Sequence, residues 1–66
     1  MHIHFNGETY TLSEPLSVAG LIEHLQLAGR RVAVELNFEI VPRSMYATTP
    51  IKEGDALEIV HAIGGG

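Results

Sequence analysis

The sequence contains no cysteine and only one lysine, Lys52, among four basic residues. The absence of cysteine excludes disulfides, thiolate nucleophiles, iron–sulfur ligation and zinc sites built from four thiolates. A domain without a disulfide or a metal must be held together by packing and hydrogen bonds alone.

Basic residues are scarce throughout: eight acidic residues against four basic ones give a formal net charge of −4. This balance argues against a nucleic-acid partner, which would require clustered Lys and Arg. It favours docking on a basic protein surface. The N-terminus has no signal-peptide pattern and no apolar run is long enough to span a bilayer, so we expect a cytoplasmic protein without a membrane partner.

The chain is short as well, with 66 residues, of which 45% are hydrophobic. A domain of this size buries only about 60% of its unfolded surface, so one small core and modest stability are expected. Such a core leaves little room for an internal catalytic pocket. Any chemistry should therefore occur at the surface or inside a partner.

The first part of the chain predicts a hairpin. Residues 1–6 alternate between apolar and polar side chains, which indicates a half-buried strand with Ile3 facing the core. Asn6-Gly7 is typical of a two-residue hairpin turn, because both turn positions require a positive φ. Residues 8–12 then return as a second strand.

A helix is predicted next, with Ser17 as its N-cap. We expect Gly29 to end this helix in a left-handed turn, and Gly20 to permit a close approach to the sheet. The apolar stripe at helical spacing consists of Val18, Leu21, Ile22, Leu25 and Ala28.

The second half of the chain predicts three further strands. Residues 31–36 alternate, 37–39 form a turn, and 40–41 form a very short strand that Pro42 stops. Residues 56–63 form the last strand. Its inward positions are Leu57, Ile59 and Ile63, and its outward positions are Glu58 and Val60.

The element order is therefore strand, strand, helix, strand, short strand, strand. One sheet with a helix packed across it is the simplest two-layer arrangement of these elements, an α+β fold. We expect a domain over residues 1–63, followed by a flexible tail over residues 64–66.

The three glycines Gly64, Gly65 and Gly66 have no side chains to bury, and they leave the backbone free to extend. They present a carboxylate at the end of a thin stem. We therefore hypothesise that the terminal carboxylate of Gly66 is the working group. The alternative is a disordered end or an added linker.

Several segments together carry a resemblance to a known family. They are the Asn6-Gly7 hairpin, Val34-Glu35-Leu36-Asn37, Ile40-Val41-Pro42-Arg43, Glu53-Gly54-Asp55 and the final run from Ile59 to Gly66.

On these segments the whole chain resembles the ubiquitin-like β-grasp fold, with a ββαββ order and a mixed sheet of four to five strands. Within that fold it is similar to the ThiS family, the bacterial sulfur carriers of thiamine synthesis. The small subunit of molybdopterin synthase belongs to a related family, so a sulfur carrier for molybdopterin or for another sulfur-transfer pathway is the alternative. That family typically has a pair of prolines shortly before its terminal Gly-Gly, and residues 60–63 contain none.

The resemblance implies a carrier that is acted on by enzymes and is not itself an enzyme. A ubiquitin-activating-type, ThiF-like enzyme would use ATP to adenylate Gly66, and sulfur from a donor such as a cysteine desulfurase would convert it to a thiocarboxylate. A ThiG-like thiazole synthase would then take the sulfur into the thiazole ring. Gly64 and Gly65 would be threaded into the partner, and the carrier would bind no cofactor.

Partners must compensate for the cost of ordering the tail, so we expect a docking patch on the outer face of the sheet. This patch is predicted around Val60, with Phe38 and Ile40 joining it. Arg43 either binds an acidic group of a partner or simply lies on the surface.

Other chemistries have little basis in this sequence. His2 and His4 share one side of a strand, but two ligands without cysteine do not make a metal site, so we expect no metal. No serine has a nucleophile context, and no phosphate-binding glycine loop is present. Two other functions stay open: an interaction module with an inert tail, and a modifier that forms isopeptide bonds.

Overall fold

The computed structural model describes residues 1–61. Expectations for Ile63 and for the tail, including the boundary between residues 1–63 and 64–66, lie outside these residues. The elements, in chain order, are β1 (His2–Phe5), β2 (Glu8–Thr11), α1 (Val18–His24), β3 (Val32–Leu36), β4 (Glu39–Val41), the 3₁₀ helix η1 (Arg43–Thr48) and β5 (Ala56–His61).

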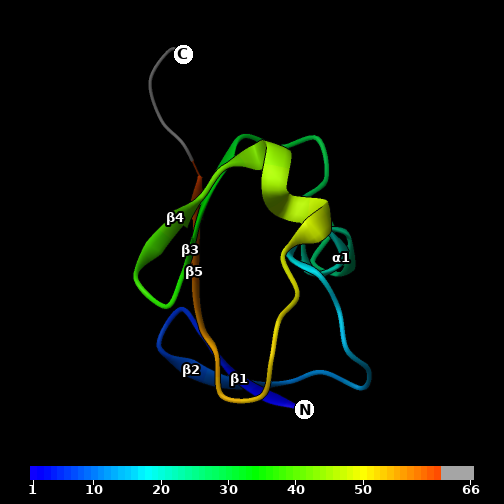
Figure 1. Cartoon of the computed structure of the whole chain (residues 1–66), viewed down its shortest axis with the longest axis vertical. Helices are drawn as coiled ribbons and strands as arrows, with labels where there is room; N and C mark the ends of the chain where they lie inside the picture. Colours follow the sequence, from blue (N-terminus) through cyan, green and yellow to red (C-terminus); the bar gives the residue numbers. More distant parts are fainter. Residues whose placement is uncertain (62–66) are drawn as a thin grey trace.

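The five strands form one sheet in the order β2-β1-β5-β3-β4. β1 and β5 run parallel, whereas the other neighbouring pairs are antiparallel, so the sheet is mixed, as predicted. Helix α1, seen nearly end-on in Figure 1, and η1 lie on one side of the sheet. The opposite side, here called the outer face, has no helix over it. No helix among residues 1–61 is long and apolar enough to cross a membrane.

The core lies between α1 and the sheet, and the predicted alternation places it correctly. Ile3, Val34 and Leu57 come from three strands, and each is at most 1% exposed. Burial of such side chains is the main favourable term in folding, at about 25 cal/mol per Å² of apolar surface. The predicted N-cap is also confirmed, since the backbone N–H of Gly20 donates to Ser17 Oγ at 3.1 Å.

The helix ends earlier than predicted. It stops at His24 and not at Gly29, because Gln26 adopts the left-handed conformation (φ 61°). The backbone N–H of Leu27 then donates to the carbonyl of Ile22 at 2.9 Å, which closes the helix end in a Schellman-type motif. Leu27 packs against the core, and this burial explains why a non-glycine residue accepts the turn.

Two further expectations for this segment are wrong. Ala28, placed in the apolar stripe, lies beyond the helix and is exposed. A methyl group built on Gly20 would meet the Leu16 side chain at 3.3 Å and then Ser17, and not the sheet. Gly20 therefore accommodates the segment that leads into the helix.

Side chains from two turns hold the central strand β5. Ile59 N–H donates to Asn6 Oδ1 at 2.9 Å, and Asn6 Nδ2 donates back to the Ile59 carbonyl at 3.2 Å. Ala56 N–H donates to Asn37 Oδ1 at 3.0 Å, and Asn37 Nδ2 donates to Asp55 Oδ1 at 3.1 Å. Both turns therefore fasten the strand that leads into the predicted site.

Candidate functional site

The predicted site follows β5 directly. This strand is flanked by β1 on one side and by β3 on the other, and its last described pairing joins His61 to Val32. Gly64, Gly65 and Gly66 lie outside the described residues. The described part of the site is thus the end of the central strand β5, where it pairs with β3, whereas its pairing with β1 is confined to Ala56 and Leu57.

Arginines gather at this end of the molecule. Arg30 and Arg31 directly precede Val32, which pairs with the last described residue of β5. Arg30 and Arg43 both line a surface hollow of about 270 Å³ with Val32 and Tyr46.

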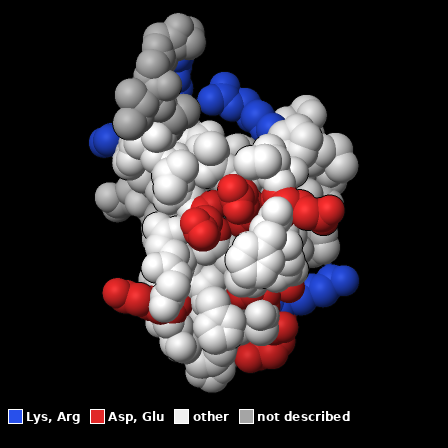
Figure 2. Space-filling view, turned by 90° about the vertical axis from the view of Figure 1, so that its left-hand side faces the viewer, with Lys and Arg blue, Asp and Glu red and all other residues white. Residues whose placement is uncertain are grey.

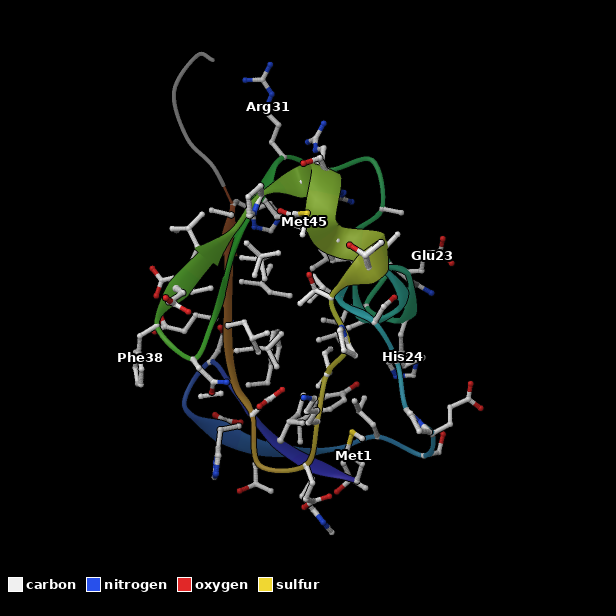
Figure 3. All side chains as sticks on the ribbon, in the orientation of Figure 1. Met1, Glu23, His24, Arg31, Phe38 and Met45 are labelled. Atoms are coloured by element: carbon white, nitrogen blue, oxygen red, sulfur yellow. The ribbon has the colours of Figure 1, made fainter. Side chains whose placement is uncertain are left out.

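Three of the four basic side chains therefore lie at one end, here called the arginine end. Figure 2 shows basic side chains along the upper edge of the molecule, and Arg31 projects from the same edge in Figure 3. This end should attract anionic groups although the chain as a whole is acidic.

Three members of the predicted interface share the outer face. Phe38 is 85% exposed, Ile40 65% and Val60 56%. Ile40 lies opposite Glu35 in the pairing of β4 with β3, and Val60 lies opposite Ala33 in the pairing of β3 with β5. Figure 3 shows Phe38 projecting away from the molecule at the turn between β3 and β4.

Arg43 is not part of this group. It is exposed and begins η1, at the arginine end. The structure also exposes Met45 to 48%, on η1, which packs beside α1 and away from the outer face. Met45 was missed because the segment 43–49 has no regular apolar spacing.

A pair of carboxylates occupies the centre of the outer face. Glu35 lies directly opposite Glu58 in the register of β3 and β5. Figure 2 looks onto this face and shows acidic side chains gathered in its middle. Neither of these glutamates forms an ion pair with a cation among residues 1–61. A hollow of about 160 Å³ lies beside the pair, lined also by His4 and Phe38.

The histidines of β1 lie where the alternation put them, exposed on the outer face. His2 Nδ1 lies 3.7 Å from Glu53 Oε2, and both side chains are well exposed, so the pair contributes little to stability. Within residues 1–61, no group of three His, Asp or Glu side chains is placed to hold a metal ion.

Comparisons with known proteins give one consistent result. A family model described as the ThiS family matches residues 3–66. The sulfur carrier protein ThiS of Bacillus subtilis is 36% identical over 50 residues, which cover 76% of each chain. A protein of Paramagnetospirillum magneticum named thiazole synthase is 47% identical over all 66 residues, but the chain spans only 20% of that protein.

A solved structure extends the likeness to three dimensions. The crystal structure of the thiamine biosynthesis protein ThiS from Geobacter metallireducens has a TM-score of 0.88 and is 38% identical. The match covers 100% of both chains. The predicted β-grasp fold is therefore confirmed.

Proposed function

The chain belongs to the ThiS family, and we propose that it is a sulfur carrier protein of thiamine biosynthesis and not itself an enzyme. The observation that carries this proposal is the family match, which runs through the final glycines to residue 66. The full-length likeness to the Geobacter metallireducens ThiS structure supports it.

The proposed working group is the backbone carboxylate of Gly66. An α-carboxyl group is ionised at neutral pH and resists nucleophilic attack. Its oxygen attacks the α-phosphorus of ATP, the bond to pyrophosphate breaks, and an acyl adenylate forms. The terminal sulfur of a persulfide then displaces AMP, and reduction of the resulting S–S bond by a thiol leaves a thiocarboxylate. The adenylate is easily hydrolysed, so these steps require a partner site that excludes water.

Glycine suits the segment that enters such a site. Gly64 and Gly65 have no Cβ to collide with the walls of a narrow channel. Fixing each residue costs about 1–2 kcal/mol, so ordering three costs about 3–6 kcal/mol. Contacts between the folded domain and the partner have to offset this cost. The exposed outer-face residues and the arginine end are the proposed sources of those contacts.

Two enzymes would use the carrier in turn. A ThiF-like activating enzyme consumes the ATP, so the carrier itself needs no bound cofactor, and a cysteine desulfurase supplies the persulfide. A ThiG-like thiazole synthase then takes the sulfur. Support for this second partner comes from the Paramagnetospirillum magneticum protein named thiazole synthase, which includes a segment similar to the whole chain. The proposed location of these reactions is the cytoplasm.

Genetic complementation tests the proposal. In a bacterium that lacks its own ThiS, the wild-type chain should restore growth without thiamine, and a variant lacking Gly66 should not. Circular dichroism should show that both fold alike. Growth with the truncated variant would instead indicate an interaction module. Rescue of a strain that lacks the small subunit of molybdopterin synthase, without rescue of the thiamine defect, would assign the chain to that pathway.

A further inference from the structure

The turn between β3 and β4 places a bulky side chain in an unfavourable backbone conformation. Asn37 and Phe38 have φ angles of 52° and 71°. The turn between β1 and β2 has nearly the same geometry, with 51° at Asn6 and 84° at Gly7. Glycine adopts this conformation without steric cost, whereas a phenylalanine does so only under strain.

The hydrogen bonds of Asn37 to Ala56 and Asp55 hold the turn, but the Phe38 ring itself gains no core packing that would favour phenylalanine at this position. Phe38 is 85% exposed and is not among the residues that pack against the core. The ring contacts found in residues 1–61 join Phe5 to Tyr10 and Tyr10 to His24, and they do not involve Phe38. Strained residues of this kind cluster at functional sites, so we expect the Phe38 ring to contribute binding free energy in a complex with a partner.

The surroundings of Phe38 indicate which chemistry such a complex would have. Ile40 and Val60 add exposed apolar area on the same face. On the same face, Glu35 and Glu58 lie directly opposite one another on neighbouring strands, and neither pairs with a cation among residues 1–61. Like charges in this position destabilise a sheet. A partner with basic side chains would remove the repulsion.

We propose, building on the sulfur-carrier function above, that Phe38 is the anchor of the surface on which the activating enzyme docks. The docking surface consists of Phe38, Ile40, Val60, Glu35 and Glu58. The activating enzyme presents an apolar socket for the ring, edged by arginine or lysine side chains that face the two glutamates. Aromatic anchors in such sockets typically dominate the affinity of an interface.

A second copy of this chain fits the surface poorly. In a two-fold dimer the same patch is used by both subunits, so each pair of glutamates would meet a like-charged surface. Charge complementarity therefore favours a partner whose surface carries basic side chains over a second copy of this chain.

Phe38→Gly is the sharpest variant, because the Asn6-Gly7 turn shows that the same geometry accepts glycine. Relief of strain should outweigh the extra unfolded-state entropy of glycine, so the midpoint of thermal unfolding should rise by a few degrees. In an ATP–pyrophosphate exchange assay with the activating enzyme, the KM for the carrier should rise about tenfold or more, with kcat little changed. Phe38→Tyr, which keeps the ring, should retain the wild-type KM.

Two further variants complete the experiment. Met45→Ala removes an exposed apolar side chain away from the outer face and should leave KM unchanged. The double variant Glu35→Gln/Glu58→Gln should raise KM and weaken its dependence on salt, because the charge attraction to the enzyme is lost.

Each contrary result has a distinct meaning. If the wild-type chain supports no exchange, the sulfur-carrier function fails and the docking inference fails with it. If the wild-type chain is active and Phe38→Gly keeps its KM, only the docking inference is overturned. A lower unfolding midpoint for Phe38→Gly would mean that the strain at Phe38 is too small to outweigh the entropy of glycine, which would remove the premise of the docking inference. Dimers of the wild type that Phe38→Gly abolishes would assign the surface to a second copy.

Discussion

Replacing Asn6 by alanine should loosen the strand that carries the working end of the molecule. The Asn6 side chain makes two hydrogen bonds to the backbone of Ile59, at 2.9 and 3.2 Å. Each contributes about 0.5–1.5 kcal/mol, so losing both costs about 1–3 kcal/mol. Asn6 also has a φ of 51°, where alanine costs about 1 kcal/mol more than a residue suited to that conformation. The expected total is about 2–4 kcal/mol.

Asn6→Gly separates the two contributions. It loses the same hydrogen bonds but accepts the positive φ, so it should be about 1 kcal/mol more stable than Asn6→Ala. Equilibrium urea unfolding, followed by circular dichroism, measures both. A 66-residue domain has only about 3–10 kcal/mol of stability in total, so both shifts are well resolved. Equal stability of Asn6→Ala and the wild type would refute the role of this side chain as a clamp on β5.

Three other substitutions have expected outcomes. Glu58→Lys replaces the repulsion from Glu35 by attraction, so the free energy of unfolding should rise by about 0.2–1 kcal/mol at low salt. Urea unfolding measures this, and no change would mean that the facing carboxylates do not interact. Gly20→Ala should raise the thermal midpoint slightly, with a gain below about 1 kcal/mol, because the flexible Leu16 side chain can move aside; a lower midpoint would show that it cannot. Leu57→Ala leaves a cavity in the core and should lower the free energy of unfolding by about 2–5 kcal/mol. Thermal unfolding should then lose its cooperativity, and a stability near that of the wild type would contradict the described core.

Alternation and capping rules, which act within one segment of the sequence, predict most of the fold correctly. Alternation placed Ile3, Leu57 and Ile59 correctly inside, and capping chemistry placed Ser17 at the helix start. The helix end was misplaced because glycine is the usual left-handed residue, whereas here the burial of Leu27 determines where the helix stops. That burial depends on tertiary packing, which periodicity within one segment does not report.

Part of the candidate site was likewise predictable from local sequence, and part was not. Exposure of Phe38, Ile40 and Val60 on one face follows from turn position and alternation, and the structure agrees. The opposition of Glu35 and Glu58 depends on the register between strands that are far apart in the sequence. Nothing local in the sequence fixes such a register. The strain at Phe38 was also missed, because a turn was predicted there without its type.

The central claim is that the carboxylate of Gly66 is the group that becomes loaded with sulfur. Intact-mass and peptide mass spectrometry, after incubation with ATP, the activating enzyme and a persulfide donor, tests it most directly. The mass should rise by the difference between one sulfur and one oxygen atom, and fragmentation should place the gain on Gly66. An unchanged mass with active enzymes, or a gain on any side chain, would contradict the account.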